Sequence, residues 1–435
     1  MATFSYSIAE TDGARPQTRD AADRTSLSKL ELIFTVVMLL YTAGAVVPLL
    51  IGGNDPLDFQ TSPLALAVKV AFYAIAFAFM LPQWRSLVRA AWDIKSILAL
   101  VAIAIISMAW SQFPSDTLTG SAVLVATTAF GVYFGTRYTV PQQLRLLAVT
   151  FSVAIAVSVA FAVFLPAYGI EPGDASGDWR GAFLQKNNLA EAMSLAFFVF
   201  LFVRPRRFHS LRWVGMAACV GLLYLARSST ALVVCFAILL TLPLYKVARA
   251  KFTLVIPVCL GVAVLLAAFL LILKTDAAGV FELVNRSPDL TGRTELWSAV
   301  LRSIAKRPWL GYGFSAFWKG MNGESATVLN AIGWPAGYGH DGYLDVMVQV
   351  GILGLATFVV GYLILWRRAL SALSRMTGPV SAWLCAYLVF MLLYNITEGY
   401  ILTQNSLYWV LYIAAAVSLF RSVPGESEWA EGSRS

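Results

Sequence analysis

The sequence predicts an all-α, polytopic membrane protein, and two observations carry this prediction. Of its 435 residues, 59% are hydrophobic and only 13% are charged, whereas soluble domains carry about 25% charged residues. Apolar stretches of about 15 to 22 residues recur along the chain, as expected for helices that cross a ~30 Å hydrocarbon core. Soluble enzymes and nucleic-acid-binding proteins are therefore excluded, and the net charge of +8 is assigned to loops that set the membrane topology.

The order of polar and apolar segments predicts five regions. Residues 1–29 form a polar, disordered cytoplasmic tail, residues 30–273 hold helices one to nine, residues 274–340 form a long periplasmic loop, residues 341–421 hold helices ten to twelve, and residues 422–435 form a second cytoplasmic tail. Several spans are short, which favours tilted or partly re-entrant helices. The twelve predicted spans are 31–51, 64–81, 96–110, 119–135, 146–168, 189–203, 213–226, 229–245, 252–273, 341–365, 380–396 and 405–420.

The distribution of basic residues predicts that both termini are cytoplasmic. With an even number of spans, the loops and tails assigned to the inside hold roughly twice as many Lys and Arg residues as the opposite side. Arg204, Arg206 and Arg207 form one such inside cluster, and Arg367 with Arg368 forms another. We interpret these clusters as topology signals without a functional role.

Basic residues on the outer side need another explanation, and they concentrate in three places. Arg180 and Lys186 flank one loop, Arg227 lies in a tight turn between two apolar helices, and the third group lies in the long loop. An arginine at membrane depth is costly and normally has an anionic partner. For Arg227 that partner is either a lipid phosphate or Glu398. The adjacent Asn187 is suited to hydrogen-bonding a sugar or capping a helix.

The long loop is predicted to contain an amphipathic helix at residues 293–307 that lies in the membrane interface. Arg293 opens this helix, where free backbone N–H groups and a guanidinium together suit a diphosphate. The remaining cations are interpreted as a solvated basic face near lipid headgroups. The apolar face of the helix consists of Leu296, Trp297, Val300, Leu301 and Ile304, and the remaining cations are Arg302, Lys306 and Arg307.

The segments that follow this helix supply aromatic and imidazole groups. A glycine-rich stretch around Tyr312 permits positive φ beside aromatic rings, and Tyr312, Trp318 and Trp334 are candidates for sugar stacking or for ordinary interfacial packing. The loop ends at His340 and Asp341. Because His209 lies among the cytoplasmic arginines, His340 is the one imidazole of the sequence on the outer face, where it is suited to accept or orient a hydroxyl proton near neutral pH.

The sequence offers no sign of a nucleotide or metal cofactor. It contains no Walker loop, Rossmann glycine pattern or HExxH motif, and no cofactor is expected. A cation bound by Asp174 or Asp178 stays an open alternative. The four cysteines lie within apolar spans without CxxC spacing, so we interpret them as small buried side chains; they are Cys219, Cys235, Cys259 and Cys385.

Four outer segments together resemble the O-antigen ligase and polymerase family of bacterial envelope glycosyltransferases. They are Trp179 to Asn187, Arg227-Ser228, Gly292 to Gly313, and His340 to Gly354. An earlier element, Trp110 to Pro114, is similar to exopolysaccharide polymerases of the succinoglycan type. The sequence departs from the commonest pattern with Asp at 341 and Ser at 229, and neither change removes a proposed catalytic group.

The resemblance implies a glycosyltransferase C-like fold in the bacterial inner membrane, with the active site facing the periplasm. It implies a donor glycan on undecaprenyl diphosphate, used without metal or nucleotide sugar, and inversion at the sugar carbon. Carried over, Arg227 and Arg293 bind the diphosphate, and His340 activates the acceptor hydroxyl. Arg180, Lys186, Asn187, Tyr312 and Asp341 are the supporting substrate-binding candidates.

The leading hypothesis is a polymerase that joins lipid-linked repeat units into an exopolysaccharide, in a lipid bilayer and with other polysaccharide assembly and export proteins as partners. A ligase that moves a finished glycan to lipid A-core or another acceptor needs the same diphosphate clamp and base, so the shared residues do not separate the two. A lipid-oligosaccharide flippase is the alternative of another class. The one-sided distribution of the notable charges argues against it, because a transporter needs a midplane site.

Overall fold

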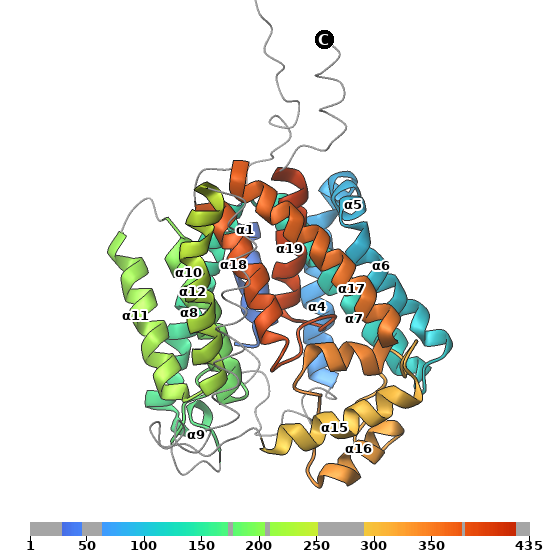
Figure 1. Cartoon of the computed structure of the whole chain (residues 1–435). Coiled ribbons are helices and arrows are strands. Elements are labelled where there is room, and N and C mark those ends of the chain that lie inside the picture. The colour runs from blue at the N-terminus through green and yellow to red at the C-terminus, as the bar shows by residue number, and fades with distance from the viewer. Residues whose placement is uncertain are drawn as a thin grey trace, which may run out of the picture.

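The computed structural model describes residues 28–45, 63–172, 177–204, 209–250, 291–375 and 379–422 (Figure 1). Within these ranges the regular secondary structure is helical, and β-type pairing is limited to one isolated bridge between Ile170 and Trp179. The all-α prediction is therefore confirmed for the described residues. They do not include most of the two tails, residues 46–51 of the first predicted span, the span at 252–273 or the first part of the long loop.

The helices follow the hydropathy prediction closely. Each predicted span other than 252–273 coincides with a helix, and one additional helix, α5, separates the second and third spans. The helices are α1 (Lys29–Thr42), α4 (Pro63–Met80), η2 (Leu81–Gln83), α5 (Trp84–Asp93), α6 (Lys95–Ile106), η3 (Ser107–Ala109), α7 (Pro114–Arg137), α8 (Val140–Phe164), α9 (Pro166–Gly169), α10 (Lys186–Phe202), α11 (His209–Ala226), α12 (Ser229–Ala250), α15 (Thr291–Lys306), α16 (Glu324–Ile332), α17 (Gly342–Arg375), α18 (Pro379–Tyr394) and α19 (Leu407–Ser422).

The lengths of these helices support a membrane protein. Four helical segments of the described chain are long and apolar enough to cross a bilayer by length and composition: Leu64–Asp93, Pro114–Arg137, Val140–Phe164 and Gly342–Leu373. Five shorter apolar helices accompany them. The exact number of spans stays a prediction.

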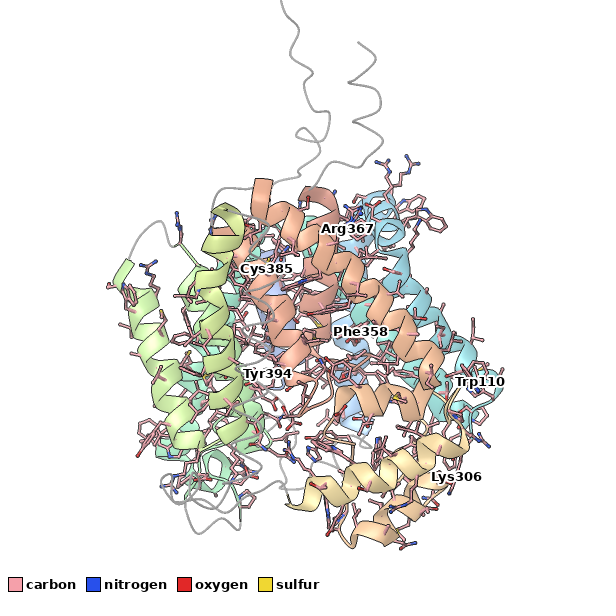
Figure 2. The ribbon with its side chains drawn as sticks, in the orientation of Figure 1. Trp110, Lys306, Phe358, Arg367, Cys385 and Tyr394 are labelled. Carbon is pink, nitrogen blue, oxygen red and sulfur yellow. The ribbon has the colours of Figure 1, made fainter. Side chains whose placement is uncertain are left out.

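The two ends of the bundle are occupied by different elements. α9, α15 and α16 lie together at one end, and α5 lies at the other (Figure 1). In Figure 2, Lys306 marks the α15 end, whereas Arg367 lies at the α5 end. The segments that the sequence assigns to the outer side thus share one end, and the Arg367 cluster lies away from them.

Close helix packing in the bundle depends on small residues. Gly131 and Gly135 of α7 face α19, where an added Cβ would lie 2.7 Å from the Cβ of Ile413 and 2.9 Å from the Cα of Ala414. Small residues allow helix backbones to approach closely, which favours packing in a membrane where hydrophobic burial contributes little.

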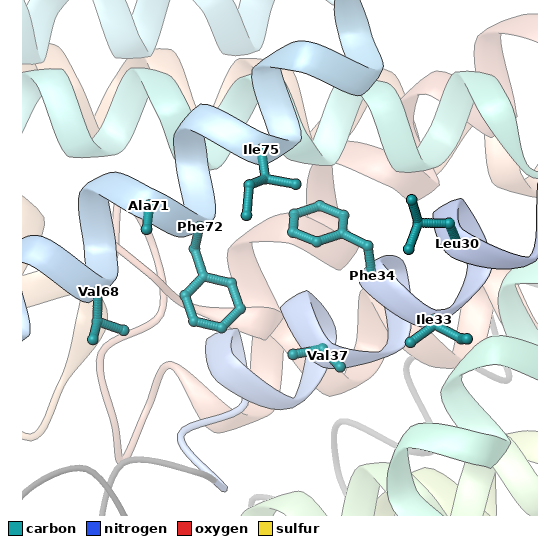
Figure 3. Close-up of a pocket in the computed structure, with 8 residues that line it drawn as sticks. All are labelled: Leu30, Ile33, Phe34, Val37, Val68, Ala71, Phe72 and Ile75. Atoms are coloured by element: carbon teal, nitrogen blue, oxygen red, sulfur yellow. The ribbon is translucent and has the colours of Figure 1, made fainter.

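Helices α1 and α4 pack less closely, and an apolar groove runs between them (Figure 3). The groove is lined by Leu30, Ile33, Phe34, Val37, Val68, Ala71, Phe72 and Ile75.

α15 does not lie in the membrane interface through its apolar face, contrary to the sequence expectation. Leu296 and Val300 are fully buried and Ile304 is nearly so, in a small core formed with α16 and α17, whereas Leu301 is exposed. The helix itself is confirmed, but its apolar face is covered by protein. The reason is α16, a partner helix that the sequence interpretation did not identify.

A kink in α17 receives the loop that follows α15. Gly351 has φ 70°, inside the residue range of α17, and the displaced backbone groups pair with the loop. The N–H groups of Tyr312 and Gly313 donate to the carbonyls of Val348 and Gln349 at 2.8 and 2.9 Å. On the other side of the kink, the N–H of Ile352 donates to the Pro308 carbonyl at 2.8 Å. The glycines of this loop therefore allow its backbone to dock on α17.

The segment beginning at Trp110 fixes the other side of the same loop. The Trp110 indole N–H donates to the Leu310 carbonyl at 2.9 Å, and the Gln112 side chain donates to the Ala316 carbonyl at 2.7 Å. A Cβ at Gly313 would lie 2.3 Å from the Ser111 hydroxyl oxygen. This polar segment therefore anchors the loop from α15 to α17.

Replacing Gly351 by alanine is expected to destabilise the protein. The added Cβ would lie 2.2 Å from the Trp309 carbonyl oxygen, at a φ that L residues rarely adopt. Backbone strain of this kind costs on the order of 1–3 kcal/mol. Thermal unfolding of the full chain in detergent measures the effect, with Gly221→Ala as the matched control because no heavy atom lies within 4 Å of that Cβ position. Equal melting temperatures for the two variants would contradict the prediction.

Candidate active site

Two of the three predicted catalytic residues meet on one carboxylate. An oxygen of Glu398 lies 3.4 Å from the Nη2 of Arg293, and its other oxygen lies 3.6 Å from the Nδ1 of His340. The Glu398 side chain is only 5% exposed, and those of Arg293 and His340 are 17% and 18% exposed. Residues about 47 positions apart in the long loop are thus brought together by a residue from a different loop.

The turn that carries Glu398 is held by hydrogen bonds from backbone N–H groups. The Asn395 side chain accepts hydrogen bonds from the N–H groups of Tyr400 and Ile401 at 2.9 and 3.2 Å. The N–H of Gly342, at the start of α17, donates to the carbonyls of Asn395 and Glu398 at 2.8 and 2.9 Å. The turn after α18 is therefore fixed directly against the residues that follow His340.

Tyr338 connects the imidazole to the same carboxylate. Its hydroxyl donates to Glu398 Oε2 at 2.8 Å, and its ring lies 3.9 Å from the His340 ring, centroid to centroid. Burial, followed by the charge of Glu398, raises the pKa of Tyr338 above its usual value. The phenol therefore stays protonated and acts as a donor to Glu398.

The loop conformation at His340 is unusual and well supported. His340 has φ 49°, a left-handed conformation that costs energy for a residue other than glycine. The preceding Gly339 is fixed on both sides: its carbonyl accepts from the Trp297 indole at 3.0 Å, and its N–H donates to Asp345 at 3.0 Å. Trp318 donates to the same Asp345 oxygen at 2.8 Å. The imidazole is thus positioned from α15, α17 and the intervening loop.

Asp341 serves as the cap of α17. Its Oδ1 accepts hydrogen bonds from the N–H groups of Tyr343 and Leu344, both at 2.9 Å. Burial raises the pKa of Asp341, while these two backbone donors act in the opposite direction. This geometry satisfies two free donors at the helix start and fixes the peptide next to His340.

A second carboxylate, that of Glu191, interacts with the Glu398 carboxylate. Glu191 of α10 is buried and accepts a hydrogen bond from the Tyr400 hydroxyl. It interacts electrostatically with Glu398 and with Arg293. The Glu398 turn is therefore tied to α10, the helix that begins at Lys186.

Arg227 belongs to a different ion-pair cluster. Its Nη1 lies 3.4 Å from one oxygen of the buried Asp178, and the Nζ of Lys186 lies 2.8 Å from the other oxygen. The Arg227 side chain is 50% exposed. This arrangement corrects the alternative in which Glu398 pairs with Arg227: Asp178 takes that position, and Glu398 takes Arg293 and His340.

Three other predicted residues have different surroundings. Arg180 is buried, and its guanidinium donates to the carbonyls of Tyr168, Ala167 and Leu184 at 2.9, 3.2 and 3.4 Å, which holds the corner after α8. Tyr312 is only 4% exposed, its hydroxyl donates to the Ser303 carbonyl at 2.9 Å, and its ring has no open face for a sugar. Asn187 lies half-buried in the first turn of α10.

The sequence interpretation did not identify Tyr338 or Asp178 as partners of the site, and it offered Glu398 only as one of two alternative partners of Arg227. A usable signal existed for Glu398, because a carboxylate between two apolar helices needs a cation nearby. Which cation it meets depends on how the last loop folds back on α17, and hydropathy does not report this. No group of three or more potential metal-ligating side chains occurs within the described residues.

The fold defines an all-helical membrane protein with a polar cluster at one end of the bundle, and comparison with known proteins supports a membrane enzyme of polysaccharide assembly. Residues 214–359 match the family model described as O-antigen ligase. The match includes Arg227, Arg293 and His340 together with the kink in α17. The resemblance to the O-antigen ligase and polymerase family is thereby confirmed.

A relative of known role points the same way. The chain is 24% identical over 307 residues to the exopolysaccharide production protein ExoQ of Rhizobium meliloti (strain 1021). This alignment covers 66% of the present chain and 67% of the relative. Together the two matches support a glycosyltransferase-like role in polysaccharide assembly.

Proposed function

We propose that the protein is an exopolysaccharide polymerase that joins oligosaccharide repeat units carried on undecaprenyl diphosphate, on the periplasmic face of the bacterial inner membrane. The observation that carries this proposal is the meeting of Arg293 and His340 on Glu398 at 3.4 and 3.6 Å. A guanidinium beside an imidazole supports this proposal, because transfer from a lipid diphosphate needs an anion-binding group and a proton acceptor. The relative's role in exopolysaccharide production favours polymerase over ligase.

In this mechanism the bond between the donor sugar carbon and the diphosphate oxygen breaks while the acceptor hydroxyl oxygen bonds to that carbon. Negative charge grows on the departing diphosphate. Arg293, and Arg227 from the Asp178 cluster, stabilise this charge as preorganised cations. The carboxylates Glu398 and Asp178 hold these guanidiniums in place before the substrate arrives, so little reorganisation is needed during the reaction.

The proton of the acceptor hydroxyl passes to His340. Nδ1 of the imidazole faces Glu398 at 3.6 Å, slightly beyond hydrogen-bond distance, and contacts of this kind often tighten when substrate binds. With the Nδ1 proton directed at Glu398, the other ring nitrogen, Nε2, carries the free lone pair that accepts the hydroxyl proton. Attack from the face opposite the diphosphate gives inversion, which rests on the family resemblance.

The test uses the purified full chain in detergent with a synthetic undecaprenyl-diphosphate repeat unit, without nucleotide sugar and with chelator present. Product size and release of the lipid diphosphate are followed together. A ladder of longer lipid-linked glycans is the expected result. Transfer only after lipid A-core or another acceptor is added would replace the polymerase with a ligase, and labelled lipid crossing a reconstituted bilayer without any transfer would replace both with a transporter.

Glu398→Gln is expected to lower the transfer rate by about 10²-fold, because the neutral amide holds neither the imidazole nor the guanidinium as the carboxylate does. The matched control is Glu324→Gln, which removes another carboxylate paired with a basic residue of α15, Lys306, at 2.6 Å. Initial rates of lipid-diphosphate release compare the two. Similar rates for both variants would show that Glu398 is only structural.

A further inference from the structure

α5 presents a surface that the reaction does not use. Three large apolar side chains at four-residue spacing are exposed on one face: Trp84 at 56%, Val88 at 58% and Trp92 at 74%. The opposite side packs into the bundle through Ala90, which is 2% exposed, against α6, α7 and α19. A folded protein does not leave such a stripe in water without a reason.

Basic residues lie beside this stripe. Arg85 and Arg89 follow Trp84 and Val88 in sequence and are also exposed, and Lys95 follows at the start of α6. Asp93 is the one acidic residue between positions 81 and 95 of the sequence. The Arg85 guanidinium lies 5.5 Å from the centre of the Trp84 ring, so a cation and an indole are presented side by side.

The position of α5 suits the edge of a bilayer. α4 and α5 form one helical segment from Leu64 to Asp93 of 30 residues, more than the roughly 20 residues needed to cross the hydrocarbon core. The chain bends at η2, and in Figure 1 α5 is seen nearly end-on at the end of the bundle, where the spanning helices run along the page. α5 therefore lies across the bundle end as a continuation of a spanning helix.

We propose that α5 is an interfacial helix that binds anionic phospholipids at the bundle end opposite the active site. Its tryptophans and Val88 enter the region between headgroups and acyl chains, as amphipathic helices do, and Trp is favoured at that depth. Arg85, Arg89 and Lys95 contact the lipid phosphates. Three cations against one carboxylate match a negatively charged leaflet, which is why we assign this face to lipid rather than to a protein partner.

The depth of α5 is tested with a nitroxide spin label on the full chain in nanodiscs. Val88→Cys carries the label on the stripe, and Met321→Cys carries it on an exposed loop at the opposite end. Parent protein is labelled in parallel to measure background labelling of the native cysteines. This background is expected to be low at Cys219, Cys235 and Cys385, which are buried. At Val88 the label is expected to collide with oxygen and to be protected from a water-soluble nickel chelate, with the reverse at Met321. Equal nickel access at both sites would overturn the proposal.

The preference for anionic lipid is tested separately. In nanodiscs containing phosphatidylglycerol, the Val88 label is expected to lie deeper than in pure phosphatidylcholine, and Arg85→Gln, Arg89→Gln and Lys95→Gln together should abolish this difference. Native mass spectrometry of the wild type and the triple variant gives a second readout. Retention of phosphatidylglycerol over phosphatidylcholine should fall roughly fivefold for each cation removed. An unchanged preference in the triple variant would overturn the role of the cations.

Discussion

His340→Ala is expected to reduce glycan transfer by about 10²–10⁴-fold, the range that general acid–base groups contribute. The loss follows from chemistry, because alanine leaves the acceptor hydroxyl without a proton acceptor. Lipid-diphosphate release by the purified variant, measured beside the wild type, gives the magnitude.

The control for this prediction separates chemistry from folding. Trp334 also lies near the imidazole, with ring centroids 6.4 Å apart, but it supplies no proton acceptor. Trp334→Phe is therefore expected to retain most of the activity, and both variants should elute as the wild type does in size exclusion. If His340→Ala kept more than about a tenth of the wild-type rate, general base catalysis by His340 would be excluded, because even its lower bound is about 10².

Arg293→Ala is expected to lower the transfer rate by about 10²–10³-fold, the usual cost of removing one preorganised group that stabilises transition-state charge. Arg293→Lys should recover only part of this loss, because an ammonium does not reproduce the planar fork that contacts both Thr397 and Glu398. In the structure these contacts are 3.1 Å to the Thr397 carbonyl and 3.4 Å to Glu398. Lipid-diphosphate release at saturating donor measures the effect.

Arg302→Ala is the matched control, since Arg302 is a basic residue of the same helix but is exposed. It is expected to leave the transfer rate within about twofold of the wild type, because surface substitutions away from a site usually have small effects. Equal losses for Arg293→Ala and Arg302→Ala would show that only the overall charge of α15 matters, and the diphosphate role of Arg293 would be contradicted.

Much of the fold could be predicted because hydropathy and the 3.6-residue period act locally. The helices at the predicted spans other than 252–273, and the α15 helix, follow from runs of apolar residues and are present within the described residues. α5 and α16 were missed for the same reason. A ten-residue basic helix and a nine-residue helix inside a loop lack the long apolar signal, and only their packing partners make them recognisable.

The site was predicted in part. Arg293 and His340 were selected as chemical groups on the outer side, and the structure does bring them together. Their meeting point, Glu398, could not be derived, because it depends on the turn after α18 folding onto the start of α17. Tyr312 and Arg180 were also selected from the sequence, but their polar groups contact other parts of the protein in the structure. Their residue types suit sugar and phosphate, but burial directs their polar groups to backbone carbonyls of the protein.

The sequence by itself therefore determined the class of protein, the helical spans and the set of candidate groups, because apolar length and residue chemistry are properties of local stretches of chain. The tertiary structure alone decided which carboxylate partners which cation. Arg227 pairs with Asp178, and Arg293 and His340 share Glu398. The physical reason is that a buried charge is stable only beside an opposite charge or a hydrogen-bond donor, and which of these it meets is set by the packing of helices far apart in sequence.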